Sequence, residues 1–567
     1  MNILGVSCYY HDSACCLLKD GDIVACAEEE RFTRKKHDYD FPSHAIDFCL
    51  KKGGISGKDL DWVVFYEKPF LKLERIFVNL INTFPRSHRL FPEILWAWIK
   101  EKLWIKIRLA RYLGIEEEKI LFLEHHLSHA SSCFYPSPFK ESAILTVDGV
   151  GEWATCTMGV GKDKEIKILK EIHFPHSLGL LYSTFTAFLG FQVNEGEYKV
   201  MGMAPYGKPR YREKMDKLVK VYPDASFELN LDYFAYPYSL TYPYSRKFID
   251  LFGEPRKKEE SHILDPHYAD IAATIQKFTE ELMLKLAHRL YEETKLPNLC
   301  LAGGVALNCV ANGRIIRETP FKNIFIQPSA GDGGGAMGAC LYVYHALLGN
   351  ERKFVLENVY LGEEYGEEEI KKDLEEEGIA YHYFEKKEEL LEKVVDDLCE
   401  GKVVGWFQGR FEFGPRALGN RSILADPRKK EMKEIVNRKV KFREPFRPFA
   451  PSVIQERVKD FFEVEELYPP LKFMLLTFPV KEKERENIPA ITHVDGSARL
   501  QVVSEKDNPI YWRLLKKFEE RTGYPLLLNT SFNLKGEPIV NTPKEAISTF
   551  SRSGLDVLVM GKFYVRK

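Results

Sequence analysis

ILGVSCYYHDSACCLLKDGDIVACA, at residues 3–27, decides the first half of the fold, and AILTVDGVGEWATCTMGVGKD, at residues 143–163, repeats its design. Each stretch is typical of an apolar strand, a tight polar turn and a second strand that ends in a further turn. In the first stretch a third strand, Ile23–Ala27, follows. Two hairpins of the same build, each opening a run of mixed sequence, predict two related halves that face a cleft. Chance resemblance between two hairpins is the alternative.

Helical and strand patterns alternate after the second hairpin. A long helical pattern, His267–Thr294, precedes short apolar strands at Leu299–Leu301 and Ile324–Ile326. Such alternation favours an α/β architecture.

The character of the sequence changes near residue 350. Residues 362–378 are rich in Glu and Lys, and a predicted helix at Lys387–Leu398 then leads into an apolar strand at Val403–Phe407. We therefore expect a boundary within residues 350–365, and two domains at residues 1–352 and 353–567.

Composition excludes several classes of protein. The 567 residues include 81 Lys and Arg and 83 Asp and Glu, a net charge of −2. The chain is therefore no polycation that coats nucleic acid or an anionic membrane. Neither a secretory leader nor an apolar run long enough to cross a membrane is predicted. The eleven cysteines form no CxxC pair, which favours reduced thiols and a cytoplasmic protein.

A stretch rich in bulky aromatic residues, residues 79–113, has no assigned role. Within it, residues 94–107 predict one amphipathic helix, because four charged residues interrupt the apolar ones: Lys100, Glu101, Lys102 and Lys106. The stretch either shapes a binding pocket or packs against the rest of the protein.

Two histidines are the first candidates for chemistry. His125 and His129 stand four residues apart in EHHLSH, which on a helix places both imidazoles on one face, about 6 Å apart. That spacing suits metal chelation. The residue after His125 is His126 rather than glutamate, which excludes the HExxH metalloprotease motif. Packing or hydrogen bonding alone is the alternative for these histidines.

A glycine-rich loop, SAGDGGGAMG at residues 329–338, follows a predicted strand and enters a helical pattern. Backbone N–H groups beside a helix start favour phosphate. Asp332 would repel phosphate unless a cation lies between them, so it is a candidate metal ligand. A tight strand–helix turn is the alternative.

A second loop, AGGVALN at residues 302–308, also follows a strand. Gly303 and Gly304 leave a flat backbone surface for a purine or ribose, and Asn308 adds an amide. An ordinary strand–helix turn is again the alternative.

Basic residues gather between Gly405 and Ala450, where 12 Lys and Arg accompany 5 Asp and Glu. Arg416 and Arg421 lie in a turn stiffened by Gly and Pro, and Lys441, Arg443 and Arg447 follow. Guanidinium groups bind phosphate in bidentate fashion, so this cluster predicts a pocket for a small anion. A nucleic-acid surface or a solvated basic face are the alternatives. Polar residues at later strand ends, in residues 492–501 and 528–533, add donors and acceptors for a ligand.

Together these motifs resemble the NodU-type O-carbamoyltransferase family. The match runs from residue 1 to about residue 545 and keeps the order of the motifs. The segments that carry it are CYYHDSA at 8–14, EERF at 29–32, the two histidines, GEYKVMG at 196–202, both glycine-rich loops, GPRALG at 414–419, HVDG at 493–496 and NTSFN at 529–533.

The resemblance implies a duplicated actin-like ATPase fold, which is ribonuclease H-like, for the first domain, similar to the threonylcarbamoyl transferases that modify tRNA. It implies a YrdC-like α/β fold for the second domain. In this family ATP and carbamoyl phosphate give a carbamoyl-adenylate in the C-terminal domain, and the carbamoyl group then passes to an acceptor hydroxyl at the N-terminal site. The expected cofactors are ATP with Mg²⁺, and Fe²⁺ or another divalent metal.

Site residues follow from motif position in the same way. The resemblance implies His125, His129 and Asp332 as metal ligands, a set that suits Fe²⁺, and places His11 and Asp12 beside the acceptor hydroxyl. Nucleotide-binding residues of the first domain would be Asp148, Gly149, Lys199, Gly303, Gly304, Asn308, Gly331, Gly333 and Gly334. Residues for carbamoyl phosphate and ATP in the second would be Arg416, Arg421, Arg443, Arg447, His493, Arg499, Asn529 and Asn533.

The chemistry agrees with this assignment. Transfer to an alcohol needs a base near the hydroxyl, which His11 can supply, and positive charge near the developing oxyanion, which a metal can supply as a Lewis acid. We therefore expect an enzyme acting on a small hydroxyl-bearing metabolite, with no nucleic-acid or membrane partner. A threonylcarbamoyl-type tRNA-modifying enzyme and a catalytically silent nucleotide-binding regulator are the rivals. The balanced charge argues against the first and the arginine cluster against the second.

Overall fold

A computed structural model describes residues 1–100 and 102–567, and the chain forms two compact units. The first contains Met1–Glu29 and His37–Leu356, and the second contains Glu30–Lys36 and Glu357–Lys567. Helix α1 (Glu30–Thr33) therefore belongs to the second unit, whereas the sequence-based bounds kept it in the first. The functional domain bounds at residue 352 stay a prediction.

The first sheet of the first unit has the strand order β3-β2-β1-β4-β5. Strands β1 to β3 form two antiparallel hairpins, with Ile3 opposite Leu18, and β4 and β5 are added in parallel to β1. The three hairpin strands have the positions that the sequence predicted. Their bounds are β1 Asn2–Ser7, β2 Ala14–Lys19, β3 Asp22–Glu28, β4 Trp62–Phe65 and β5 Ile120–Phe122.

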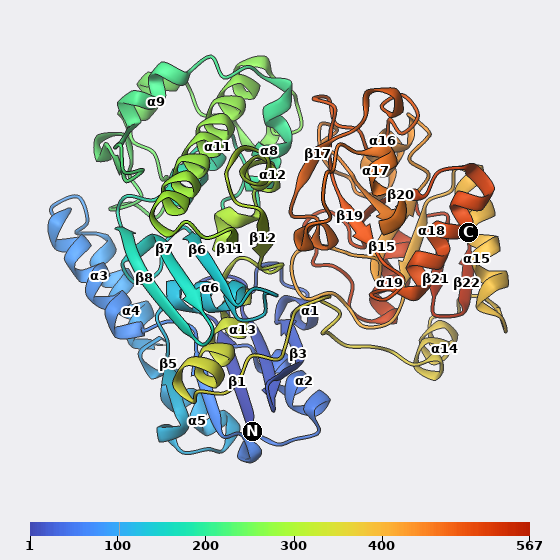
Figure 1. The fold of residues 1–567 in the computed structure, drawn as a ribbon, viewed down its shortest axis with the longest axis horizontal. Coiled ribbons are helices and arrows are strands. Elements are labelled where there is room, and N and C mark those ends of the chain that lie inside the picture. Colours follow the sequence, from blue (N-terminus) through green and yellow to red (C-terminus); the bar gives the residue numbers. More distant parts are fainter. Residues whose placement is uncertain (101) are drawn as a thin grey trace. The chain divides into compact units, whose positions relative to one another are not determined.

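The second sheet has the order β12-β11-β6-β7-β8. Read from β8, it repeats the strand order and the strand directions of the first sheet. Figure 1 shows its strands in cyan to green. The predicted duplication, typical of the actin-like ATPase fold, is confirmed, and the unit is mixed α/β. The bounds are β6 Glu141–Val147, β7 Ala154–Lys162, β8 Glu165–His173, β11 Asn298–Ala302 and β12 Asn323–Ile326.

Two buried helices lie where the two sheets meet. Helix α13 (Asp332–Tyr342) packs against β1, β2 and helix α6 (His125–Phe134), and α6 also packs against β6 and β11. Glycines allow this close approach, since a Cβ atom on Gly5 or Gly338 would lie 1.9 Å from a backbone oxygen of the neighbouring element. The packing brings the first residues of both helices, which carry the predicted metal ligands, into one place.

The second unit is built on a sheet of order β13-β22-β21-β14-β15-β20-β16-β19. Helices α15 (Lys387–Glu400) and α18 (Pro509–Thr522) pack against each other, and their apolar residues share one core with Trp406 of the sheet. The unit is mixed α/β, and its resemblance to YrdC stays a prediction. The strands are β13 His382–Tyr383, β14 Val404–Phe407, β15 Arg421–Ala425, β16 Ala450–Ile454, β19 Gln501–Val503, β20 Leu526–Ser531, β21 Val557–Met560 and β22 Phe563–Arg566.

The single helix predicted over residues 94–107 is wrong. Helix α4 ends at Lys100, a short 3₁₀ turn covers Lys102–Trp104, and α5 begins at Ile105. The predicted helix includes Glu101, which lies outside the described residues. Periodicity alone could not show this change of direction, because apolar residues continue through it. No helix among the described residues is long and apolar enough to span a membrane.

The remaining helices surround these cores. The predicted helix at His267–Thr294 is confirmed as α11. The bounds are α2 Ser43–Gly53, α3 Pro69–Asn82, α4 Leu90–Lys100, α5 Ile105–Leu113, α7 Leu178–Phe188, α8 Glu197–Met203, α9 Arg212–Leu218, α10 Arg246–Phe252, α11 Pro266–Thr294, α12 Cys309–Glu318, α14 Glu367–Glu376, α16 Met432–Ile435, α17 Val458–Phe461 and α19 Pro543–Arg552.

Candidate functional site

Four buried side chains converge at the junction of α6 and α13. The Nε2 atoms of His125 and His129 are 3.0 Å apart, as expected for residues one helical turn apart. The Asp332 carboxylate lies 3.7 Å and 3.8 Å from these nitrogens, and the Asp148 carboxylate 3.3 Å and 3.9 Å. Asp148 follows β6 directly, and Asp332 is the first residue of α13.

This donor set fits a divalent metal. The four ligand atoms lie within 4.8 Å of one another, and Asp332 Oδ1 is buried without a hydrogen bond. Two imidazoles with carboxylates suit Fe²⁺ and related ions. Metal binding here, and the identity of the metal, stay predictions. Asp148 was expected to bind nucleotide, whereas the structure places it among the candidate metal ligands.

The two histidines of this cluster differ in protonation. Burial lowers the pKa of His129 well below its usual value, so its imidazole is neutral and able to ligate. Burial acts against the positive form of His125 as well, but the Asp332 and Asp148 carboxylates outweigh it and raise the pKa of His125 to about 9. A bound cation would replace that proton.

His11 and Asp12 lie beside the cluster in the turn between β1 and β2. His11 Nδ1 is 3.0 Å from Asp12, His37 Nδ1 is 2.7 Å from the other oxygen of Asp12, and His11 Nε2 lies 3.9 Å from Asp332. Asp12 has φ +50°, a left-handed backbone that non-glycine residues adopt at a cost. Despite burial, Asp332 and Asp12 raise the pKa of His11 to about 10.

The glycine-rich loops divide into open and packed positions. A Cβ on Gly331 would meet no atom within 4 Å, and one on Gly149 would have only contacts of 3.8 Å or more, so both can face a ligand. A Cβ on Gly333 or Gly334 would instead lie 3.1 Å or 2.1 Å from an oxygen atom of Ser329. At the latter two positions, close packing explains the glycines without a ligand.

The second loop is tied to the candidate metal ligands. The Gly304 N–H donates to Asp148 at 2.7 Å, while Gly303 has φ +91°. The Asn308 side chain caps α12 and exchanges hydrogen bonds with Gln276, so its amide is engaged within the fold. Lys199 of α8 is buried, with Nζ 5.8 Å from the centre of the Phe191 ring.

In the second unit, a buried carboxylate organises the arginine loop. Glu412 Oε1 accepts the backbone N–H groups of Leu418 at 2.7 Å, Asn420 at 2.8 Å and Arg421 at 3.2 Å. The Arg421 guanidinium is fully buried, lies 3.6 Å from the centre of the Phe407 ring and donates to main-chain carbonyls. Arg421 therefore braces the loop in this structure, rather than presenting its donors to an anion. Arg416 on the same loop is partly exposed.

Lys441 is the central cation of this unit. It is 4% exposed, and its Nζ donates to Ser531 and Asn533, at 2.8 Å and 2.9 Å to their carbonyls. Burial, followed by the charges of Arg443 and Arg447, lowers the pKa of Lys441 well below its usual value. Arg443 stacks at 4.4 Å on Phe449, and the structure thus gathers Arg443, Arg447, Lys441 and Asn533.

Other predicted residues of this unit have mixed placements. Asn529 lies within β20 rather than at its end, and its amide donates to the Ala417 carbonyl and to Gln501. Asn529 therefore stabilises the arginine loop through its hydrogen bond to the Ala417 carbonyl. Arg499 ends β18 (Ser497–Arg499), and His493, before that strand, is partly exposed.

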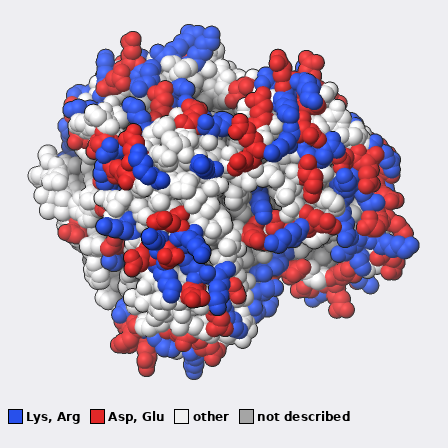
Figure 2. All heavy atoms as spheres, viewed as in Figure 1, with Lys and Arg blue, Asp and Glu red and all other residues white. Residues whose placement is uncertain are grey.

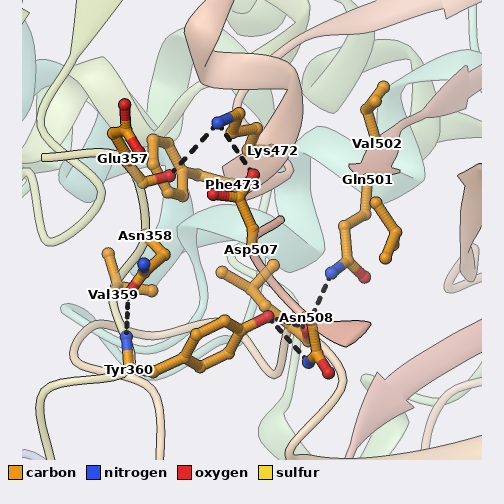
Figure 3. A pocket seen from close by; sticks show the side chains of 12 residues that line it. Glu357, Asn358, Val359, Tyr360, Lys472, Phe473, Gln501, Val502, Asp507 and Asn508 are labelled. Carbon is orange, nitrogen blue, oxygen red and sulfur yellow. Dashed lines mark hydrogen bonds and ion pairs between the residues drawn. The ribbon is translucent and has the colours of Figure 1, made fainter. Parts of the chain in front are cut away.

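A small pocket lies against the same loop. Figure 3 shows Tyr360 and Gln501 among its lining residues, and both donate to the Leu418 carbonyl, at 2.8 Å and 2.7 Å. Lys472 and Asp507 form an ion pair at its edge. Two residues that line the pocket thus bind the Leu418 carbonyl, whereas Glu412 binds the N–H group of the same residue. Over the face drawn in Figure 2, acidic and basic residues are mixed, as the balanced charge predicts.

Sequence reasoning missed some residues of the site. Asp148 was not recognised as a candidate ligand, although the repeated hairpin design places an aspartate in both turns. Tyr66 donates to Asp332 at 3.1 Å, and its only signal is its position directly after the apolar strand β4. Glu412 gave no signal, because its role depends on backbone N–H groups that no pattern of side chains reveals.

Comparisons with known proteins identify the family. A family model described as the carbamoyltransferase N-terminus matches residues 2–341, and one described as the carbamoyltransferase C-terminus matches residues 395–567. An uncharacterized protein of Synechocystis is 49% identical, over 100% of this chain and 97% of that protein. Nodulation protein NolNO of Sinorhizobium fredii is 38% identical over 99% and 79%, and nodulation protein NolO of Bradyrhizobium diazoefficiens is 40% identical over 78% and 79%.

Both family models together cover most of the chain, and two of the three relatives extend over nearly all of it. The motifs that first suggested the resemblance lie at the two sites described above, one in each unit. The protein belongs to the carbamoyltransferase family and is a NodU-like carbamoyltransferase.

Proposed function

We propose that the protein is an O-carbamoyltransferase that uses ATP and carbamoyl phosphate to carbamoylate a hydroxyl group of a small acceptor. The observation that carries the proposal is a pair of sites suited to ligands of opposite charge, one in each unit. Four buried candidate metal ligands lie beside His11 in the first unit, and a buried lysine without a carboxylate partner lies among arginines in the second.

The second unit would form the activated donor. Carbamoyl phosphate, ATP and one water would give carbamoyl-adenylate, phosphate and pyrophosphate. The ammonium of Lys441 and the guanidinium of Arg416 would hold the anionic groups, because charge-assisted hydrogen bonds are about twice as strong as neutral ones. Glu412 would keep the loop in shape through the three N–H groups that it accepts.

The first unit would carry out the transfer. The acceptor oxygen bonds to the carbamoyl carbon, the bond from that carbon to the AMP phosphate oxygen breaks, and the hydroxyl proton passes to His11. Asp12 would orient His11 through its 3.0 Å contact with Nδ1, leaving Nε2 toward the reacting groups. A metal held by His125, His129, Asp148 and Asp332 would supply Lewis acidity. Its positive charge would also lower the pKa of His11, so that more of its imidazole would be unprotonated and able to accept the hydroxyl proton at neutral pH.

The test is the release of pyrophosphate from ATP by the full-length protein, with and without carbamoyl phosphate and with and without Fe²⁺. We expect release that depends on carbamoyl phosphate, followed by a carbamoyl mass increase in an acceptor. ATP binding with no carbamoyl-phosphate dependence would instead indicate a nucleotide-binding regulator. Retention on tRNA at moderate salt would favour the threonylcarbamoyl-type alternative.

A further inference from the structure

Arg75 of helix α3 is a buried cation that forms no ion pair with any described residue. Arg75 is only 7% exposed, and its Nε atom is buried without a hydrogen bond to any described residue. Among residues 1–100 and 102–567, the guanidinium makes no hydrogen bond and no ion pair. Its one close contact is the Phe174 ring, whose centre lies 4.9 Å away. Burial of an unpaired charge is costly, so proteins usually pair such groups with a counter-ion.

The nearby carboxylates are already engaged. Glu67 pairs with Lys72 at 2.5 Å, and both side chains are about as buried as Arg75. The Glu152 carboxylate accepts the backbone N–H groups of Lys68 at 2.7 Å and His125 at 3.0 Å. Neither carboxylate therefore contacts Arg75, although the charges of both act on it.

A third cation, Lys102, shares this environment. It makes neither a hydrogen bond nor an ion pair within the described part of the chain, and its Nζ lies 5.4 Å from the centre of the Trp98 ring. Burial, and next the charge of Lys72, lower the pKa of Lys102 to about 8, with Arg75 contributing. The charges of Lys72 and Arg75 thus both act on Lys102. Among the described residues, Glu67 forms an ion pair with Lys72 and with neither of the other two cations.

This cationic cluster, defined as Lys72, Arg75 and Lys102, adjoins the predicted transfer site. Lys72 Nζ lies 4.5 Å from the centre of the Tyr10 ring, and that ring is 4.8 Å from the ring of His11. Tyr10 therefore lies in contact with both the cluster and His11. All of these residues belong to the first unit.

We propose that the cationic cluster binds a carboxylate or phosphate group of the acceptor, so that the acceptor is an anionic hydroxyl compound. The proposal rests on the function proposed above and specifies its substrate class. Arg75 supplies the planar guanidinium that matches either oxyanion in bidentate fashion. Neutral sugars and polycationic acceptors would leave Arg75 unpaired.

The first test is direct and does not depend on catalysis. Inorganic phosphate is titrated calorimetrically into the full-length wild type, Arg75→Gln, Arg416→Gln and the exposed control Arg86→Gln. We expect one class of sites to disappear in Arg75→Gln and to persist in Arg416→Gln and Arg86→Gln. An unchanged titration of folded Arg75→Gln would overturn the proposal, even if the enzyme proved active.

Thermal unfolding guards against a folding defect. If Arg75 awaits an anion, Arg75→Met should unfold at the same temperature as wild type or higher without phosphate, and phosphate should raise the midpoint of wild type more than that of the variant. A lowered midpoint for Arg75→Met without phosphate would show a structural role and overturn the proposal.

The second test uses matched acceptors: glycerol 3-phosphate with glycerol, and glycerate with its amide. AMP formation that depends on acceptor should favour the anionic member of each pair, and Arg75→Gln should reduce kcat/KM for it at least tenfold while pyrophosphate release is unchanged. Equal loss with anionic and neutral acceptors would assign Arg75 to the donor phosphate and overturn the proposal. Absence of all pyrophosphate release would count against the proposed function. The phosphate titration would still decide whether the cationic cluster binds an anion.

Discussion

The two sites differ in the sign of the charged side chains that each one buries: carboxylates in the first unit and a lysine in the second. In the first unit, two carboxylates converge on two imidazoles, and one carboxylate oxygen of Asp332 has no hydrogen bond. In the second unit, Lys441 is held by the neutral groups of Ser531 and Asn533. Buried charges that lack a counter-charge are costly, so the first arrangement calls for a cation and the second for an anion. This difference supports the proposal that the two units bind ligands of opposite charge.

The contrast extends to the way each site is supported. Three of the four candidate metal ligands lie in the first turns of two helices that glycines bring close together, and the fourth, Asp148, directly follows β6. They are therefore fixed by the packing of regular elements. The arginine loop is instead held by side-chain contacts to its backbone, from Glu412, Gln501 and Asn529. The first site should therefore be rigid without its ligand, whereas the second depends on single supporting residues.

The largest expected effect breaks the first site alone. His129→Ala removes one of four candidate ligands, so bound metal should fall below one per protein, with affinity reduced more than 100-fold, since even residues behind a ligand contribute 10–100-fold. The acceptor-dependent step should be lost while pyrophosphate release persists. Metal analysis and the two assays are the measurements.

His126→Gln is the matched control for that change. His126 lies on the same helix, equally buried, but its Nδ1 is 2.7 Å from Thr146 and it is outside the ligand set. Metal content should therefore stay at the wild-type level. If His129→Ala stopped pyrophosphate release as well, one shared site would replace the two described here.

The second prediction breaks the second site alone. Lys441→Met removes the ammonium that donates to Ser531 and Asn533, and loss of one such electrostatic group typically slows a reaction by about 100- to 1,000-fold. Pyrophosphate release should fall by this factor with bound metal unchanged. Lys439→Met, an exposed change two residues away, should have no effect. Wild-type release by Lys441→Met would show that the buried ammonium has no role in donor formation.

The third prediction sharpens the difference in support. Glu412→Gln keeps the shape of the side chain but removes the negative charge toward which three N–H groups point, and weakening such charge-assisted bonds costs about 1–2 kcal/mol. Pyrophosphate release should drop about tenfold, mainly through a higher KM for carbamoyl phosphate. Asp12→Asn, a change in the first unit, should leave this KM unaltered. A changed kcat with an unchanged KM would contradict the positioning role.

The features that could be predicted from the sequence are those fixed by regular elements, and the features that were missed depend on tertiary contacts. The hairpin strands and the helix face shared by His125 and His129 could be derived from local patterns, because regular elements fix them. The approach of Asp332 to the two histidines was implied by the family resemblance and not by a local pattern. The ligand role of Asp148 was not foreseen, since it needs the two sheets to be brought together. The bracing by Arg421 was not foreseen either, because a run of arginines near glycines does not show which ones donate to main-chain carbonyls.

The cationic cluster was the least predictable part. Lys72 and Arg75 lie in α3, which contains exposed Phe70 and Ile81 as well, so its polar residues resemble those of any surface helix. Only the tertiary structure shows that these two are buried beside Tyr10. The break between α4 and α5, which positions Lys102, was predicted as a continuous helix for the same reason.

The smallest expected effect concerns pH and the second unit. The pKa of Lys441 is lowered well below its unfolded value of about 10.4. Between those two values the unfolded chain binds one more proton than the folded protein, so stability must rise with pH, by at most about 1.4 kcal/mol per pH unit. Above the unfolded value the gain ends.

Lys441→Met should lack this slope, and inorganic phosphate should reduce it in the wild type, because a bound anion favours the charged ammonium. Hydrogen exchange of the β20 amides reports stability within the second unit, and comparison of wild type with Lys441→Met at each of pH 7, 8 and 9 cancels the intrinsic pH dependence of exchange. The difference between the two should widen with pH and narrow with phosphate. Parallel behaviour at all three values would mean that Lys441 keeps its proton in the folded protein, so that the second site already contains its counter-charge and the contrast between the two units fails.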